Sequence, residues 1–207
     1  MERKLEFQQE SCWGFLDLEK AYDKINRGMI PPVLRLYNVP EELINMVMAL
    51  YRSPSTQVRT CFGKTKAFAV NVGLHQGSAL SPLLFIIMLD YISKQCPMER
   101  GHKVIYADDI ALGANKSEEL QQAVDMWDNQ LAVHGMRMSK KKTEVLEVSR
   151  GQPVPRLEIT VDGQQLKQTT AFKYLGSWQH ESGDLDREIT GKVAGYREYM
   201  EECLHCS

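Results

Sequence analysis

The run "VIYADDIAL", Val104–Leu112, places two adjacent aspartates in the middle of apolar residues. On either side lie two short β-type runs, "HKVIYA" at 102–107 and "DIALGA" at 109–114. Aspartate caps backbone donors and tolerates turn geometry, so a strand, a turn and a second strand explain the pattern. A purely structural turn is one interpretation. The other interpretation is a metal site. We expect the flanking strands to be buried, and carboxylates at their tip would repel one another unless a divalent cation neutralised them.

The composition favours a soluble, intracellular protein with one domain, or one domain and the start of another. Of the 207 residues 43% are hydrophobic, yet no apolar stretch approaches the roughly 18 residues of a membrane span. The N-terminus also lacks the apolar segment of a secretion signal. Lys and Arg number 25 against 27 Asp and Glu, which gives a net charge of -2. Any contact with a polyanion must therefore come from local patches.

The cysteines indicate reduced thiols rather than a disulfide framework, because their number is odd and their spacing is irregular. There are five, at positions 12, 61, 96, 203 and 206. The C-terminal "CLHC" is half of a zinc-binding pattern, but no second pair accompanies it. The end of a helix is the simpler interpretation of Cys203 and Cys206.

The order of the expected elements is typical of an α+β fold with a largely antiparallel sheet. We expect a buried strand at 12–18, a further strand at 143–149, and a hairpin of 56–62 with 67–72 that turns at 63–66. Helices are expected at 40–51, at 81–95, where apolar residues lie on nearly every side, and from Ser117 to a C-terminal cap at Gly135. The two prolines and the glycine at 151–155 mark the best candidate for a domain boundary.

A second acidic residue interrupts an apolar strand in the same way, since Asp17 stands between Leu16 and Leu18. Magnesium prefers hard oxygen ligands, usually one or two carboxylates together with substrate phosphates. Two metal ions roughly 3.5 to 4 Å apart can hold the attacking and the leaving oxygen of a phosphoryl displacement. Asp17 together with the aspartate pair would complete such a two-metal site.

Five segments together resemble the palm motifs A to E of reverse transcriptases, in order and in approximate spacing. They are "FLDLEKAYDKI" at 15–25, "GLHQGSALSPLLF" at 73–85, "YADDIAL" at 106–112, "GMRMSKKKTEVL" at 135–146 and "FKYLGSW" at 172–178. The sequence is most similar to the polymerases of non-LTR (LINE-like) retrotransposons, and more distantly to those of group II introns and other prokaryotic elements. The resemblance runs from about Asp17 to Gly176, which is most of the chain.

The resemblance implies a fold and a division into domains. The fold would be a ferredoxin-like polymerase palm, with packed helices, a C-terminal hairpin and the start of a thumb. Residues 1–150 would form the palm, and residues 151–207 the primer-grip hairpin and a partial thumb helix. Only 16 residues precede Asp17, so the fingers region of the family would be missing from this chain.

The resemblance assigns Asp17, Asp108 and Asp109 as catalytic residues that hold two Mg²⁺ ions, for which Mn²⁺ could substitute. The carbonyl of Leu18 would be a further metal ligand. Adjacent strand residues point to opposite faces, so we expect Asp108 to be the direct ligand and Asp109 to be secondary unless the chain turns there. Asp23 is expected to cap the next helical segment rather than to bind metal.

Four residues would contact the incoming nucleotide by the same resemblance. Tyr22 would select deoxynucleotides by its ring, Gln76 and Gly77 would approach the nucleotide and template, and Lys142 would lie near the triphosphate. Each has a plainer interpretation: Tyr22 as a core residue, the Gln76–Gly77 stretch as a connecting loop, and the lysines around Lys142 as a solvated face.

The last motif implies a contact with the primer. Tyr174, Leu175 and Gly176 match the primer-grip hairpin and would press on the primer backbone; otherwise they form an ordinary hairpin. Beyond them a helical pattern runs through Leu185, Ile189, Val193, Tyr196 and Met200. The implied partners are an RNA template, a DNA primer and dNTPs, without a membrane, and the fingers, thumb and endonuclease regions of a larger polyprotein.

The sequence therefore leads to an RNA-directed DNA polymerase palm of a retrotransposon that acts inside the cell, in the nucleus or cytoplasm if the host is eukaryotic. The alternative is a catalytically inactive remnant, or a domain adopted by its host, that binds nucleic acid or protein partners. Metal-dependent nucleotide binding that disappears in Asp108→Asn would separate the two, because a non-enzymatic remnant does not need it.

Overall fold

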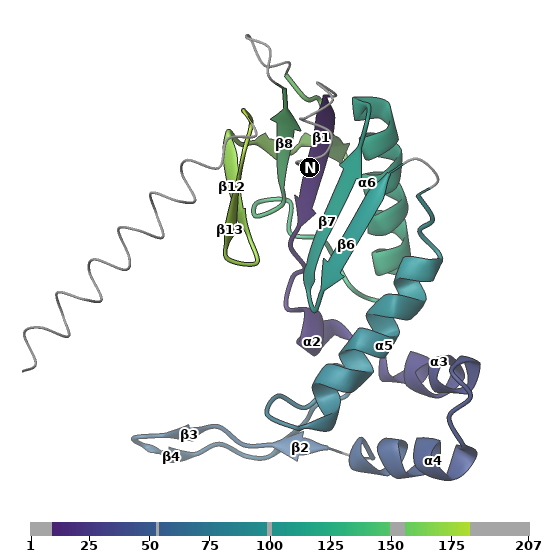
Figure 1. Ribbon diagram of the computed structural model, residues 1–207. Helices are drawn as coiled ribbons and strands as arrows, with labels where there is room; N and C mark the ends of the chain where they lie inside the picture. Colours follow the sequence, from purple (N-terminus) through teal and green to yellow (C-terminus); the bar gives the residue numbers. More distant parts are fainter. Residues whose placement is uncertain (1–9, 53, 99–100, 150–155, 183–207) are drawn as a thin grey trace, which may run out of the picture.

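The computed structural model describes residues 10–52, 54–98, 101–149 and 156–182. Its centre is a five-stranded sheet with the strand order β11-β8-β1-β7-β6 (Figure 1). The strands are β1 Ser11–Leu16, β6 His102–Tyr106, β7 Asp109–Ala114, β8 Glu144–Val148 and β11 Lys167–Gln168. All neighbours are antiparallel except β11 and β8, which are parallel. The expected α+β fold with a largely antiparallel sheet is confirmed.

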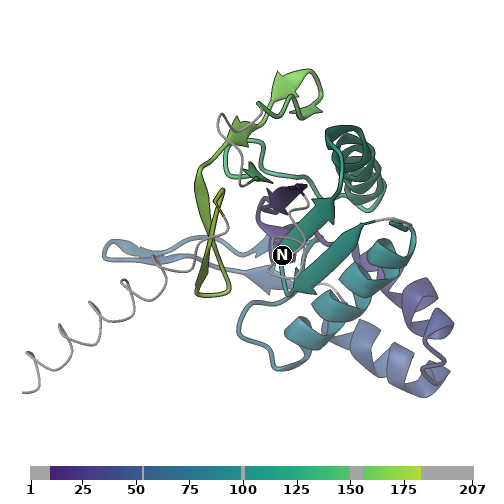
Figure 2. The same ribbon diagram turned by 45° about the horizontal axis from the view of Figure 1, so that its top comes forward.

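Two helices pack on one face of this sheet, α5 Leu80–Lys94 and α6 Ser117–Val133 (Figures 1 and 2). Helix α6 buries Leu120, Val124, Trp127 and Leu131, which recur at helical spacing. It ends as expected, with Gly135 just beyond the helix at a φ of +80°, where glycine avoids the clash of a Cβ.

Helix α5 departs from the expectation of burial on all sides. It buries Phe85, Met88, Leu89 and Ile92 against the sheet and its neighbours, whereas Leu83 and Ile86 are more than half exposed. The apolar run was wrongly interpreted as a helix within a core, because hydrophobicity alone does not show whether a partner covers each face.

A smaller apolar cluster covers the opposite face of the sheet, and a hairpin closes it. The hairpin consists of β12 Ala171–Tyr174 and β13 Ser177–His180. The ring of Phe172 stacks on Phe15 of β1 with 4.0 Å between ring centroids. The hairpin strands were expected from the sequence, and this stack fixes them on the sheet near the β6–β7 turn.

The strand β6 lies at the edge of the sheet and is only half buried. The expectation that both strands around the aspartates are buried is therefore wrong for β6, where Val104 and Tyr106 are exposed. Lys103, the residue before Val104, turns inward. Its Nζ donates hydrogen bonds to the carbonyls of Ser93 and Cys96 at the C-terminal end of α5.

Below the sheet in Figure 1 lie four short helices and a long hairpin. The helices are α2 Ala21–Lys24, the 3-10 helix η1 Arg27–Met29, α3 Ile30–Leu36 and α4 Glu41–Leu50. The hairpin, residues 55–69, is called the arm below; it pairs β2 Ser55–Thr56 with β5 Phe68–Ala69, and β3 Arg59–Thr60 with β4 Gly63–Lys64. Its tight turn lies at Thr60–Gly63 and not at 63–66 as expected, so the lysines belong to the returning strand.

The segment after 155 continues the same core. It contains β9 Thr160–Val161, β10 Gln164–Gln165 and the edge strand β11. Leu157, Ile159 and Leu166 are buried in the same cluster as the helices and the sheet. The expected boundary near 151–155 stays a prediction, and the expected thumb helix and the "CLHC" residues lie outside the described part of the chain.

Two further expectations concern cysteines and membranes. Cys12 and Cys96 are buried free thiols and Cys61 is an exposed one, as the reduced state requires. In the described ranges, no helix combines the length and the apolarity that crossing a bilayer would take.

Candidate active site

The register of the sheet brings two of the three expected aspartates face to face. Leu16 at the end of β1 pairs with Ile110 of β7. Asp17 follows Leu16, Asp109 precedes Ile110, and the strands are antiparallel, so continuing the ladder sets Asp17 opposite Asp109. Asp108 occupies the two-residue turn before them, where Ala107 has a φ of +50°. Adjacent residues of a strand point to opposite faces. Because the chain turns at Asp108, both acids can lie near one site.

The electrostatics of the three acids reflect this arrangement. Burial raises the pKa of Asp109, and the charges of Asp108 and Asp17 raise it further. The Oδ2 atom of Asp17 is buried and has no hydrogen-bond partner. The nearest cation is Lys142, whose Nζ lies 3.5 Å from that oxygen and whose side chain is 73% exposed. The carboxylates therefore lack enough positive charge from the chain itself.

These features fit a divalent cation, which would relieve the repulsion and engage the orphan oxygen of Asp17. Among the residues that the structure describes, no group of three or more His, Cys, Asp or Glu is close enough to hold a metal alone. A metal here would take its remaining ligands from water and substrate phosphates, which is the usual coordination of Mg²⁺.

The backbone around Asp17 is held by the segment that carries the lysines. The amide of Ser139 donates to the carbonyl of Asp17 at 2.8 Å, and the amide of Glu19 donates to Arg137 at 2.9 Å. Thr143 accepts a hydrogen bond from the amide of Asp17 through its hydroxyl. The two backbone bonds of Ser139 and Glu19 form a β-bridge between Leu18 and Met138. Neither bond uses the carbonyl of Leu18, the expected metal ligand, so the bridge does not occupy that oxygen.

The three consecutive lysines separate in space. Lys140 forms an ion pair with Asp162 at 2.7 Å, Lys141 is exposed, and Lys142 lies beside Asp17. Of the three, the structure therefore brings only Lys142 to the aspartates. Its contact with the triphosphate stays a prediction.

Tyr22 and Gln76 lie together at the N-terminal side of α5. The ring of Tyr22 stacks on Phe85 with 4.5 Å between centroids, and its carbonyl accepts from the amide of Leu74. The side chain of Gln76 donates to Asp23 at 2.8 Å. Gly77 adopts a φ of +83°, and no atom lies within 4 Å of the position that a Cβ would take.

The expected capping role of Asp23 is wrong. Asp23 lies inside α2, and its carboxylate accepts from Gln76 instead. Asn26 caps the next segment, because its side chain accepts from the amide of Gly28. The place of Asp23 before the next helical segment suggested the cap, but Asn26, three residues later, has the extended backbone that a cap requires.

Sequence reasoning missed Arg27, which shapes the loop that carries Gln76. Arg27 is 7% exposed, and its guanidinium donates to the carbonyls of Val70, Val72 and Gly73. It also lies 4.9 Å from the centroid of the Tyr51 ring. A single arginine at the start of a 3-10 helix has no distinctive pattern, so the sequence carried no signal for this role.

The expected primer-grip residues form the tip of the β12–β13 hairpin. Leu175 and Gly176 are its two-residue loop, with φ values of +49° and +86°, as a type I′ turn requires. The hydroxyl of Tyr174 donates within 3.3 Å of the carbonyls of Val104 and Asp109. This contact ties the hairpin to the strand that carries Asp109, while its role toward a primer stays a prediction.

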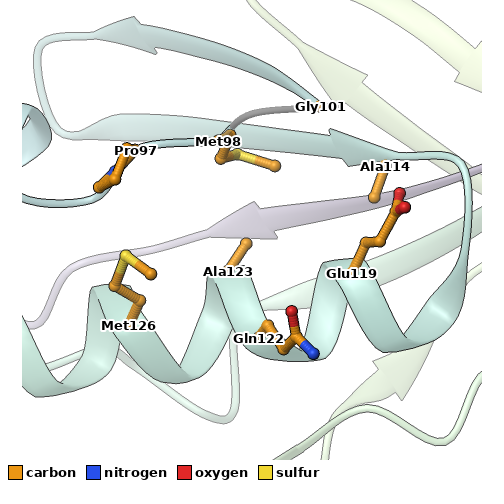
Figure 3. Close-up of a pocket in the computed structure, with 8 residues that line it drawn as sticks. All are labelled: Pro97, Met98, Gly101, Ala114, Glu119, Gln122, Ala123 and Met126. Carbon is orange, nitrogen blue, oxygen red and sulfur yellow. The ribbon is translucent and has the colours of Figure 1, made fainter.

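A cavity of about 330 Å³ lies elsewhere in the molecule, beside α6 (Figure 3). Met98 and Met126 line it together with Glu119 and Ala114. Ala114 and Asp109 are at opposite ends of β7, about 17 Å apart at roughly 3.4 Å per residue. The cavity is therefore not part of the aspartate site.

Comparison with known proteins shows to which protein family the chain belongs. The family described as "Reverse transcriptase (RNA-dependent DNA polymerase)" matches residues 2–178, which is most of the chain. The chain belongs to the reverse transcriptase family. Reverse transcriptases use divalent metal ions and act on a nucleic-acid template and primer, and the expected resemblance is confirmed at this level.

Curated relatives narrow the type of reverse transcriptase. The chain is 27% identical over 199 residues to the Pol polyprotein of the type-1 retrotransposable element R2 of Nasonia vitripennis, covering 88% of the chain and 19% of the relative. It is 28% identical over 184 residues to that of the type-2 element R2DM of Drosophila melanogaster, covering 80% and 17%. These relatives are non-LTR retrotransposon proteins, and the chain spans about a fifth of their length.

Solved structures support the reverse transcriptase fold. Telomerase from Candida tropicalis without its C-terminal domain matches with a TM-score of 0.65 at 14% identity, over 88% of this chain and 37% of that one. The same telomerase in complex with a fragment of telomeric RNA matches with a TM-score of 0.66, over 89% and 32%. The expected palm-like α+β architecture is thus confirmed, while the roles of single site residues stay predictions.

Proposed function

We propose that this chain is the palm of a retrotransposon RNA-directed DNA polymerase, which joins dNTPs to a primer 3′-hydroxyl along an RNA template. The observation that carries the proposal is the meeting of Asp17 and Asp109 beside the Asp108 turn, with a buried Asp17 oxygen that has no hydrogen-bond partner and lies 3.5 Å from the exposed ammonium of Lys142. Three acids with this repulsion are suited to hold the charge of metal ions, which then bind phosphate.

Two Mg²⁺ ions, with Mn²⁺ as a substitute, are the proposed cofactors. They would supply the stabilisation of the attacking and leaving oxygens. Asp17, Asp108, Asp109 and the carbonyl of Leu18 would hold them. Lys142 would stabilise the charge that develops on the pyrophosphate, because its ammonium lies at the edge of the same carboxylates.

The remaining residues would position the substrates. Tyr22, supported from below by Phe85, would meet the sugar of the incoming nucleotide. Gln76 and Gly77 would face the nucleotide and template, and the hairpin tip at Tyr174, Leu175 and Gly176 would hold the primer. Fingers, thumb and endonuclease regions would belong to the longer polyprotein, which would act inside the cell.

The test is extension of a DNA primer on an RNA template by the purified chain, with Mg²⁺ or Mn²⁺. We expect extension by the unmodified chain and its loss in Asp108→Asn. Asp125→Asn is the matched control, since Asp125 is exposed on α6 and far from the turn. Equal extension by Asp108→Asn and the control would contradict the proposed site.

An inactive remnant that binds partners is the second candidate. Metal-dependent binding of a dNTP distinguishes the two even when the chain does not extend a primer. Binding that needs Mg²⁺ and disappears in Asp108→Asn supports the polymerase. A folded chain without such binding supports the remnant.

A further inference from the structure

The arm belongs to a long segment of the sequence, residues 43–89, that contains no acidic residue. Between Glu42 and Asp90 the sequence contains four Lys or Arg and no Asp or Glu, so all 27 acidic residues lie elsewhere. Three of the cations, Arg59, Lys64 and Lys66, belong to the arm, and Arg52 precedes it. A chain with a net charge of -2 thus concentrates positive charge in one hairpin.

The arm buries nothing of its own. Every residue from Ser55 to Ala69 is exposed, on both faces of the hairpin. Two-stranded hairpins without a packed face are marginally stable in water. Arg59 pairs directly with Lys64 across the strands, and like charges at such a pair repel each other. A polyanion would remove this repulsion.

The tip of the arm carries an aromatic ring with no contact to the rest of the molecule. Phe62 is 98% exposed and lies in the turn between β3 and β4. Folding does not account for a phenylalanine at this place, since its burial would contribute to stability and here it contributes none. A free ring flanked by cations is the arrangement on which an unpaired base stacks while its phosphates meet the charges.

The arm also points to the appropriate side of the molecule. Figures 1 and 2 show that the arm and the β12–β13 hairpin project from the same side of the sheet. The base of the arm continues into the loop with Gln76, which Arg27 anchors through the carbonyls of Val70, Val72 and Gly73. A strand held on the arm would therefore lead toward the aspartate site.

We propose that the arm is a binding site for the single-stranded part of the RNA template, with Arg59, Lys64 and Lys66 on its phosphates and Phe62 stacked on a base. This inference rests on the proposed function and names a template contact away from the metal site. A protein partner is less favoured, because protein interfaces are depleted in lysine and two of the three cations of the arm are lysines.

The experiment measures binding of the full chain to a fluorescent 20-nucleotide single-stranded RNA in EDTA, over a series of salt concentrations. Without metal, the readout is independent of catalysis, so failure of the polymerase proposal does not change it. The variants are the triple Arg59→Gln, Lys64→Gln, Lys66→Gln and the single Phe62→Ala. The charge-matched control is Lys116→Gln, Arg156→Gln, Lys167→Gln, all exposed positions outside the arm.

We expect the arm triple variant to weaken binding and to reduce the slope of log K against log salt by about 2, at roughly 0.7 per phosphate contact. Phe62→Ala should weaken binding about tenfold with little change in slope. Thermal unfolding should be unchanged in both, since the arm buries nothing.

The proposal is overturned if the arm variants bind RNA as tightly as the charge-matched control, or if the unmodified chain binds no RNA. Arm variants that keep RNA binding but change the concentration-dependent mass of the chain in solution would assign the arm to protein association, which also overturns it.

Discussion

At the scale of single residues, the acids at the two ends of the sheet differ in their electrostatic surroundings. Glu147 of β8 lies opposite Cys12 of β1 and is 6% exposed. Burial raises its pKa to about 7, and the charge of Glu10 acts in the same direction. A carboxyl kept neutral in this way links folding to pH, because the unfolded chain ionises it near its ordinary pKa of 4.5.

The stability of the protein should therefore fall as pH rises from about 4.5 to 7. Below this window both states hold the proton, and above it the folded state must bury the charge. In Glu147→Gln this contribution disappears, so we expect the variant to be on the order of 2 kcal/mol more stable than the unmodified chain at pH 8 and similar at pH 4.5. Urea unfolding at the two values measures it. Glu158→Gln, at an exposed position, is the control; a variant difference that does not change with pH would contradict the prediction.

Tyr22 should determine the choice of sugar in a longer form of the polymerase that extends primers. In Tyr22→Ala, the ring that stacks on Phe85 is removed, and the space for a 2′-hydroxyl opens. We expect roughly tenfold more ribonucleotide incorporation, which corresponds to about 1.4 kcal/mol. Competition of ribo- and deoxynucleotides in primer extension measures it. Tyr22→Phe keeps the ring and should keep the selectivity; unchanged selectivity in Tyr22→Ala would remove the assignment.

Residue types and spacing were enough to predict that Asp17 and the Asp108–Asp109 pair would meet, because each interrupts an apolar strand in the same way. They did not show that Asp109 faces Asp17 or that Asp23 binds Gln76. Both facts depend on strand register and on loop contacts between distant segments, which local patterns do not contain.

At the scale of elements, the side chain of Arg27 holds the base of the arm, together with the backbone bonds of Gly73 and Leu74. Arg27 donates to three carbonyls at the base of the arm, and a lysine could not reproduce this planar fork. We expect Arg27→Lys to lower the free energy of unfolding by about 3 kcal/mol, since buried carbonyls lose charged donors. Urea unfolding measures the loss, and hydrogen exchange of the Gly73 and Leu74 amides should become faster.

Arg35→Lys is the matched control, because Arg35 pairs with Glu41 on the surface and such pairs contribute little. If both variants lose the same small amount, Arg27 does not hold the arm.

The elements themselves were largely predictable. Periodicity and caps located α4, α5, α6 and the β6–β7 hairpin, because these signals are local. The exposed side of α5 and the half-exposed strand β6 were not predictable, since their surroundings are set by the packing of other elements.

At the scale of the whole molecule, the core crosses the expected boundary at 151–155. Leu157, Ile159, Val161 and Leu166 are buried in the same cluster as the palm helices, and β11 pairs with β8. Four side chains at about 1.5 to 3 kcal/mol each approach the total stability of a domain. A chain that ends at residue 150 should therefore lose cooperative unfolding.

Thermal unfolding followed by circular dichroism tests this. A chain that ends at residue 182 is the control and should unfold cooperatively. If the chain that ends at 150 unfolds with the same midpoint, residues 1–150 fold independently and the predicted division into two domains is supported.

The inward lysine of the edge strand has a consequence for the behaviour of the protein at high concentration. An open strand edge such as that of β6 invites a second chain to extend the sheet, which is a route to aggregation. Lys103 opposes this, because its ammonium is committed to the carbonyls of Ser93 and Cys96 beneath the strand. If β6 shifted its register to pair with a second chain, the ammonium of Lys103 would be buried without the carbonyls of Ser93 and Cys96. We therefore expect the side chain that bonds the C-terminal end of α5 also to oppose association of molecules through this edge.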